Sequence, residues 1–225
     1  MTSLINFKAT LIIVSKSDIS KYKVYVGDHS KDAVDQNEQS MEISNIFRHP
    51  NYDNHKKTND FAILITNQAI DFKFPNVKPV CLPSERDAER LNGDLTGLRG
   101  TISGWGSGWD LDGTATANVF HIANVTVENK YICDRRYIQL KIDDSMICAG
   151  YDNGDTFIDS CNGDSGGPMT TLIRGKNTLV GVTSFGHSQC SNMQKLPGVY
   201  GRVSKVLNWI QTYTVGPVYE PAENG

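Results

Sequence analysis

The sequence predicts an all-β protein with one helix near its C-terminus. Short runs rich in β-branched and aromatic residues recur at intervals typical of sandwiches and barrels, and turn-rich segments separate them. Strand and helix patterns do not alternate regularly, which argues against a parallel α/β fold. The predicted strands are Tyr22–Val26, Ile43–Phe47, Phe61–Ile65, Thr101–Trp105, Phe120–Val127, Leu179–Phe185 and Gly198–Val203.

The predicted helix begins near Ser204, whose hydroxyl is suited to capping, and ends before Gly216-Pro217. Its apolar residues recur at helical spacing, at Val203, Val206, Leu207 and Ile210. The polar segment Ser84–Leu98 is predicted to connect two β lobes. The stretches Asp152–Asp155 and Gly104–Gly113 are predicted to be loops, because they are rich in turn residues.

Composition excludes several classes of protein. The 225 residues are 39% hydrophobic, with a net charge of −3 and no run of five like charges. Disorder, nucleic-acid binding by bulk charge and membrane binding by charge are therefore not expected. No apolar stretch approaches the ~18 residues that span a bilayer. Asn6 and Lys8 also interrupt the apolar start, so it does not resemble a secretory signal.

The five cysteines are an odd number without a CxxC pair. This pattern disfavours a metal cluster and predicts two disulfides with one cysteine left over, in an oxidising compartment.

The segment Asp159–Pro168, with the sequence DSCNGDSGGP, places a hydroxyl among glycines. The backbone amides of Gly163 and Ser165 can point together at a developing oxyanion, as acyl transfer requires. A bare GxSxG could instead be a tight turn between strands. It also occurs in α/β-hydrolases, but that fold needs an acid and then a histidine after the serine, and only tail carboxylates and His187 follow Ser165.

With its flanking motifs, the sequence resembles the chymotrypsin/trypsin family of serine endopeptidases from about Lys21 to Thr212. The resemblance implies two six-stranded antiparallel β-barrels, the first incomplete here, in a domain spanning residues 16–216. Its lobes would cover about 16–90 and 91–216, leaving 1–15 as a non-matching segment and 217–225 as a tail. The matching motifs, beside GDSGGP, are Thr58–Leu64, Val80–Pro83, Ser103–Gly106, Met146–Gly150, Ser184–Gly186 and Pro197–Tyr200.

The resemblance implies that Ser165 is the nucleophile, that Gly163 and Ser165 form the oxyanion hole, and that Asp60 orients a histidine. Without the motif, Asp60 would be read as a cap or turn residue. Asp159 matches the base of a pocket that selects Arg or Lys, since a desolvated carboxylate favours a cationic side chain. The remaining pocket residues implied are Ser160, Ser184, Phe185, Gly186 and Gly198.

The family also implies disulfides Cys133–Cys148 and Cys161–Cys190, and an unpaired Cys81 whose partner in many relatives is an upstream pro-segment. The loop 27–39 resembles the trypsin calcium loop, with Asp28, Asp35 and Glu38 as oxygen ligands. A solvated acidic loop is the other interpretation. Asn124-Val125-Thr126 is a glycosylation sequon if the protein is secreted, which family and cysteines imply.

The segment that bears the family's catalytic histidine has no counterpart here, and none of the five histidines falls at its position. His187, on the pocket rim, is only a remote replacement. Asp164 also lacks the N-terminal ammonium that pairs with it in the family. These features, with the unpaired Cys81, suggest an N-terminally truncated protease.

The expected activity is cleavage after Arg or Lys through an acyl-enzyme on Ser165, without a required cofactor. Its partners would be a protein or peptide substrate and an upstream chain joined through Cys81, with no nucleic acid or membrane. The alternative is an inactive homologue that acts as a binding or regulatory module.

Overall fold

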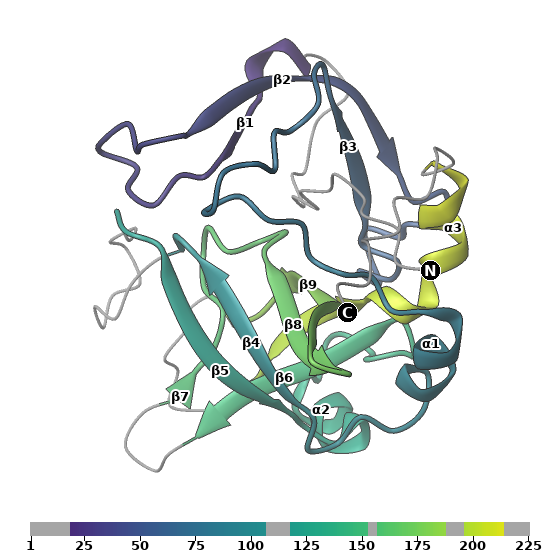
Figure 1. Ribbon diagram of the computed structural model, residues 1–225. Coiled ribbons are helices and arrows are strands. Elements are labelled where there is room, and N and C mark those ends of the chain that lie inside the picture. Colours follow the sequence, from purple (N-terminus) through teal and green to yellow (C-terminus); the bar gives the residue numbers. More distant parts are fainter. Residues whose placement is uncertain (1–18, 107–117, 153–156, 188–195, 214–225) are drawn as a thin grey trace.

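The computed structural model describes residues 19–106, 118–152, 157–187 and 196–213, which form two antiparallel β-sheets (Figure 1). The first sheet contains β1 (Lys23–Val26), β2 (Gln39–Arg48) and β3 (Ala62–Thr66), in that order. Apolar residues alternate with exposed ones along β1 and β2, which gives the sheet one buried face. That face packs around Val24, Met41, Ile43 and Leu64.

The second sheet is a closed barrel. Its strand order is β10-β9-β8-β4-β5-β6-β7, and β10 also pairs with β6, so six strands close on themselves with β7 at the edge. These pairings confirm the expected all-β fold with a barrel of the chymotrypsin type. The strands are β4 (Arg99–Gly104), β5 (His121–Val127), β6 (Met146–Asp152), β7 (Phe157–Ile158), β8 (Pro168–Ile173), β9 (Lys176–Phe185) and β10 (Gly198–Arg202).

Three short α-helices accompany the sheets: α1 (Glu85–Leu91), α2 (Lys130–Arg136) and α3 (Leu207–Thr212). The 3-10 turns Ile19–Lys21 and Val203–Lys205 complete the described elements. None of the described helices is long and apolar enough to cross a membrane.

The predicted C-terminal helix is confirmed, whereas α1 and α2 were not predicted. The C-terminal helix α3 exists, but a 3-10 turn precedes it, and Ser204 does not cap it because its hydroxyl donates to the carbonyl of Leu91. The predicted helix end at Gly216-Pro217 lies outside the described residues. Helix α1 lies inside the segment predicted as a polar connection, where Ser84 accepts a hydrogen bond from the amide of Asp87 and caps the helix.

A shared core joins the first sheet to the barrel. Phe61 and Ile63 pack with Leu179 and Val182 of β9 and with the segment leading into α3. The ring of Phe61 fills the space that a side chain on Gly201 would occupy, so a larger residue there would have to displace the ring. This packing fixes the residues next to Phe61, including Asp60, against the barrel.

Candidate active site

The loop that carries Ser165, residues 159–167, connects β7 to β8 at the junction of the two sheets. Two backbone hydrogen bonds tie it to β9: the Gly166 amide donates to Thr183, and the Thr183 amide donates to Gly167. The Gly167 amide donates within the loop to the Asp164 carbonyl. The loop is therefore held on both sides while the side chain of Ser165 stays exposed.

Glycines give the Ser165 loop its shape. Gly163 has a φ of 97° and Gly166 a φ of 81°, in the region that favours glycine. Among the described residues, the amides of Gly163 and Ser165 donate no hydrogen bond, although the amides between and after them do. These two donors are thus free to bind an anionic oxygen.

Asp164 anchors the Ser165 loop to the end of β4. Its two carboxylate oxygens accept hydrogen bonds from the backbone amides of Gly106 (2.8 Å) and Cys161 (2.9 Å). A side chain at Gly104 or Gly106 would collide with this carboxylate. The carboxylate that was expected to lack a cation is therefore held by two backbone amides.

Asp60 is buried where the first sheet meets β9. Its Oδ2 accepts a hydrogen bond from the Ser184 hydroxyl at 2.5 Å. Burial raises the pKa of Asp60, and the Ser184 hydrogen bond acts in the opposite direction. All five histidines lie in the described residues, and none of them hydrogen-bonds to Asp60.

Asp159 lies at the end of β7, with its carboxylate enclosed by glycines. Side chains on Gly198 or Gly186 would meet its oxygens. Oδ1 accepts a hydrogen bond from the Ser160 amide at 2.6 Å, whereas Oδ2 is buried without a hydrogen-bond partner. Burial raises the pKa of Asp159 to about 7, although the hydrogen bonds from Ser160 and others oppose the rise. An unpartnered buried carboxylate oxygen is suited to receive a cation.

Sequence reasoning missed two residues of this region. Tyr200 is fully buried, and its hydroxyl donates to the hydroxyl of Ser160 at 3.2 Å beside Asp159. The available signal was its spacing: Gly198 and Tyr200 are two apart on β10 and so share a face. Thr183 hydrogen-bonds to the Ser165 loop through both its backbone amide and its backbone carbonyl. No motif in the sequence indicated this role.

Phe185 forms the aromatic wall beside these residues. Its ring meets that of Tyr137 edge-on, with centroids 5.8 Å apart. The Tyr137 hydroxyl donates to the carbonyl of Pro197 at 2.6 Å, which ties α2 and the residues after it to the start of β10. Burial raises the pKa of Tyr137, so the hydroxyl remains a donor.

The cysteines follow the expected pattern as far as the structure describes them. Cys133 on α2 and Cys148 on β6 form a disulfide. Cys161 is disulfide-bonded, but its predicted partner Cys190 lies outside the described residues. Cys81 has a free thiol and is half-buried.

The loop between β1 and β2 does not assemble the predicted calcium ligands. Asp35 accepts hydrogen bonds from the amides of His29 and Ser30, and Glu38 accepts one from the amide of Asp35. No group of three metal-ligating side chains occurs in the part of the chain that the structure describes. In this arrangement the carboxylates of Asp35 and Glu38 hold backbone amides of the loop.

Asn124, in the predicted glycosylation sequon, is exposed on β5. Its side chain accepts a hydrogen bond from Thr101 on the neighbouring strand at 3.2 Å.

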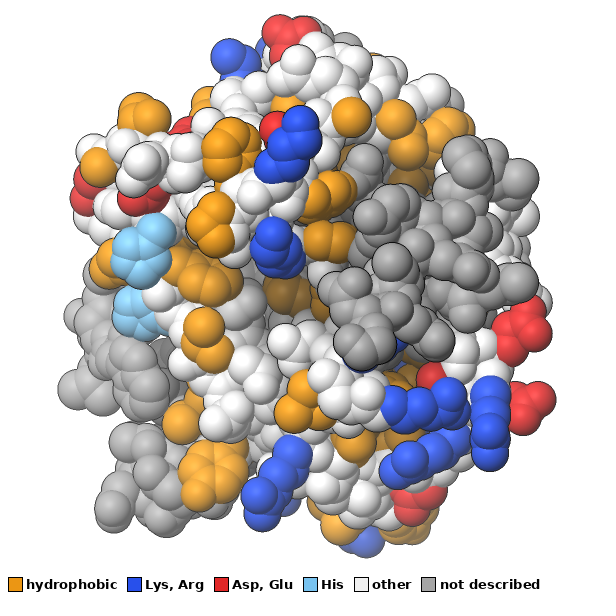
Figure 2. Space-filling view, viewed as in Figure 1, with side chains coloured by type: hydrophobic (Ala, Val, Ile, Leu, Met, Phe, Trp, Pro, Cys, Tyr) orange, Lys and Arg blue, Asp and Glu red, His pale blue; other side chains and the backbone are white. Residues whose placement is uncertain are grey.

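A cavity of about 810 Å³ opens between the first sheet and the Ser165 loop. Val24, Ile43 and Leu64 line one side, while Ser165 and Trp105 line the other. Hydrophobic side chains gather around the middle of the face in Figure 2, between the two sheets. The exposed hydroxyl of Ser165 therefore borders a space large enough for several side chains.

Two comparisons with known proteins bear on this geometry. The trypsin family model matches residues 13–210. The chain is also 35% identical over 185 residues to a CLIP domain-containing serine protease B15 of Anopheles gambiae. That alignment covers 76% of this chain and 45% of the relative, so the chain spans less than half the length of that protein.

Proposed function

Because the chain belongs to the trypsin family of serine proteases, we propose that it cleaves peptide bonds after Arg or Lys, with Ser165 as nucleophile. Proteolysis is the activity of the family, so the proposal concerns the residues and the specificity. The observation that carries it is the buried carboxylate of Asp159, whose Oδ2 has no hydrogen-bond partner. A guanidinium or ammonium group would supply the missing partner, whereas an apolar side chain would leave the oxygen unpaired.

The chemistry proposed is acyl transfer in two steps. The Ser165 hydroxyl gives its proton to a general base as its oxygen attacks the carbonyl carbon, and the amide N–H groups of Gly163 and Ser165 bind the oxyanion. The leaving amine departs with a proton, and water then hydrolyses the acyl-enzyme. Asp60 would hold the imidazole of the base, with its own carboxylate fixed by Ser184.

Further proposals concern the surroundings of the site. The walls of the Asp159 pocket would include Ser160, Ser184, Phe185, Gly186 and Gly198. Cys161 would pair with Cys190 beside the pocket, and the Cys81 thiol would pair with an upstream segment. Secretion and glycosylation at Asn124 would follow the family. The arrangement of Asp35 and Glu38 does not support calcium binding.

A second candidate function rests on the absence of a bonded histidine at Asp60. A family member without its base would act as a binding or regulatory module, through the Asp159 pocket or the cavity beside Ser165. We expect the chain alone to show negligible turnover, because loss of the base leaves only a residual ~10³–10⁴ acceleration.

Two measurements separate the candidates. A peptide aldehyde ending in arginine should bind the chain, and added imidazole should restore hydrolysis of an arginine thioester. Ser165→Ala should abolish both the rescue and the tight binding, and an aldehyde ending in norleucine should bind weakly. Failure of both the binding and the rescue would favour the binding-module function. In a form with measurable activity, Asp159→Ser should shift preference away from Arg and Lys.

A further inference from the structure

The loop between β1 and β2, residues 27–39, runs from the first sheet toward the ends of β4 and β5 (Figure 1). Two backbone hydrogen bonds attach it to the segment that leads into β5. The Lys31 amide donates to the carbonyl of Asn118 at 2.8 Å, and the Phe120 amide donates to the carbonyl of His29 at 2.9 Å. This loop of the first sheet is therefore fixed to the second sheet.

The same loop holds Trp105, just after the end of β4. The ammonium group of Lys31 donates a hydrogen bond to the backbone carbonyl of Trp105 at 2.9 Å. The indole N–H of Trp105 donates in return to the carbonyl of His29 at 3.1 Å, and its ring packs against Phe120 with centroids 4.6 Å apart. Trp105 is thus bound to the loop through both its backbone and its side chain.

Carboxylates of the loop place Lys31 for this contact. Asp35 accepts hydrogen bonds from the backbone amides of His29 and Ser30, the two residues before Lys31. Asp32, the residue after Lys31, accepts a hydrogen bond from the side chain of Asn118. Side chains that bond to nearby backbone amides fix the local course of a loop. The backbone on both sides of Lys31 is therefore held.

The carbonyl that Lys31 binds belongs to the peptide group that anchors Asp164. This peptide group joins Trp105 to Gly106, and its N–H donates to the carboxylate of Asp164 at 2.8 Å. A peptide group is planar, and in its trans form the C=O and N–H point in opposite directions. Lys31 and Asp164 therefore hold the two ends of one rigid unit, and Gly106 is buried.

The oxyanion donor Gly163 lies against this same peptide group. A Cβ atom built on Gly163 would lie 3.2 Å from the Cα of Gly106 and 3.9 Å from the carbonyl oxygen of Trp105. Asp164, which follows Gly163 in the chain, is bonded to the N–H of the peptide group. A rotation of the peptide group would therefore displace both Gly163 and Asp164.

We propose that Lys31 is a positioning residue for the oxyanion hole. By binding the carbonyl of Trp105, it orients the N–H of Gly106 toward Asp164 and keeps Gly163 in place. A charged donor on the carbonyl also polarises the N–H of the same peptide group, which strengthens the bond to Asp164. The inference rests on the proposed function, in which the Gly163 amide binds the oxyanion.

The first test compares two ligands that use different parts of the site. A peptide aldehyde ending in arginine forms a hemiacetal: the Ser165 oxygen bonds to the aldehyde carbon, and the former carbonyl oxygen, which takes up the serine proton, would lie at the Gly163 amide. Benzamidine needs only the carboxylate of Asp159. In the full chain, Lys31→Met should weaken aldehyde binding about fivefold through loss of one exposed hydrogen bond from a charged group. Benzamidine affinity should stay within about twofold, and Lys31→Arg, which keeps a charged donor, should restore most of the aldehyde affinity.

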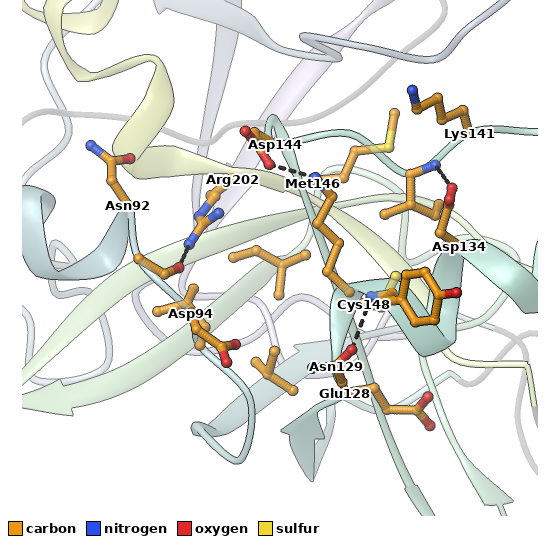
Figure 3. A pocket seen from close by; sticks show the side chains of 17 residues that line it. Asn92, Asp94, Glu128, Asn129, Asp134, Lys141, Asp144, Met146, Cys148 and Arg202 are labelled. Carbon is orange, nitrogen blue, oxygen red and sulfur yellow. Dashed lines mark hydrogen bonds and ion pairs between the residues drawn. The ribbon is translucent and has the colours of Figure 1, made fainter.

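The matched control is Lys141→Met. Lys141 is also an exposed lysine, but it lies at a pocket of about 500 Å³ that is lined by residues of α2 and β6 (Figure 3). Its replacement should leave both affinities within about twofold, as is usual for surface substitutions.

The second test is amide hydrogen exchange measured by NMR, which depends on no ligand. The amide of Gly106 should exchange about fivefold faster in Lys31→Met, because its bond to Asp164 is held less firmly. The amide of Arg202, which donates to the carbonyl of Ser145 at 2.8 Å, reports opening of the barrel and should not change. A merely structural role of Lys31 would accelerate the exchange of both amides equally.

Each outcome decides the proposal. Weaker aldehyde binding with unchanged benzamidine affinity, together with faster exchange at Gly106 alone, supports it. Equal acceleration at Gly106 and Arg202, or no change at Gly106, overturns it. If aldehyde binding by the wild-type chain does not depend on Ser165, the proposed function fails, and the exchange at Gly106 then decides separately whether Lys31 positions this peptide group.

Discussion

The raised pKa of Asp159 predicts that binding of a cation in its pocket depends on pH. Burial moves this pKa from an ordinary 3.8 to about 7 in the free protein. An amidinium such as benzamidine stays charged across this range and needs the ionised carboxylate. Its affinity should therefore rise with pH up to about 7 and then level off.

The magnitude follows from the cost of ionising the acid. Two pH units below the pKa, ionisation costs roughly 2.7 kcal/mol, which is about 100-fold in affinity. The dissociation constant of benzamidine at pH 5 should thus be about 100-fold higher than at pH 8.5, with most of the change below pH 7. A surface carboxylate with a pKa near 4 would give a change of less than about twofold over the same range.

The same group affects folding stability. A carboxyl whose pKa is higher in the folded state binds its proton more tightly there, so stability falls as pH rises from about 4 to about 7. The loss for a shift of this size is on the order of 4 kcal/mol by pH 8. Asp60, whose pKa burial also raises, changes stability in the same direction. The difference between the wild-type chain and Asp159→Asn therefore isolates the contribution of Asp159.

The assay is calorimetric titration with benzamidine at several pH values, alongside urea unfolding at pH 5 and pH 8. Asp159→Asn should lose the pH-dependent binding and become relatively more stable at the higher pH. Glu89→Gln, which removes an exposed carboxylate on α1, is the matched control. A benzamidine affinity that is constant between pH 5 and pH 8.5, or unchanged in Asp159→Asn, would refute the reasoning.

Three further predictions concern other parts of the structure. Replacing Cys133 and Cys148 together by alanine should cost about 3 kcal/mol of unfolding free energy in urea, since the bond closes a loop of about fifteen residues; a loss below about 1 kcal/mol would contradict this. Ser184→Ala should cost about 1–3 kcal/mol at neutral pH by leaving the Asp60 carboxylate unpaired, and less at pH 3, which lies below the ordinary value of 3.8 from which burial raises the pKa of Asp60; equal losses at both pH values would argue against it. Excess EDTA should leave the thermal midpoint unchanged, because the described carboxylates of the β1–β2 loop hold backbone amides, whereas saturable stabilisation by calcium would count against that arrangement.

The sequence predicted most strands of the fold but missed β6, β7 and β8 of the second sheet. The predicted runs were found where β-branched residues cluster, as in β5 and β9. β6 and β8 were missed as strands because methionine, proline and glycine weaken the local signal there, and barrel closure with β10 and β4 compensates for it. Helix α1 was missed because its seven residues are mostly charged and bury only Ala88 and Leu91.

Only those parts of the candidate site that lie in continuous sequence motifs could be predicted. The glycine-rich segment identified the Ser165 loop, but the partners that hold it, Thr183 and Gly106, lie far away in sequence. For the loop 27–39, by contrast, the sequence suggested a calcium site that the arrangement of the side chains does not show. The residue types of that loop suit the ion, yet its carboxylates turn to backbone amides, which composition cannot reveal.

The described contacts make the Ser165 loop depend on the first sheet. Phe61 packs against Gly201 and fixes Asp60, which bonds to Ser184 on β9. The neighbouring Thr183 bonds to the loop on both its backbone groups. A change that loosens the first sheet would therefore release Ser184, and through β9 the anchor of the loop. Loss of the Ser184 hydrogen bond would leave the buried Asp60 carboxylate unpaired, which is unfavourable. A change in β9 that moves Ser184 would therefore also destabilise the first sheet. Asp60 does not itself contact the Ser165 loop. The first sheet therefore contributes to the geometry at Ser165 indirectly, through β9.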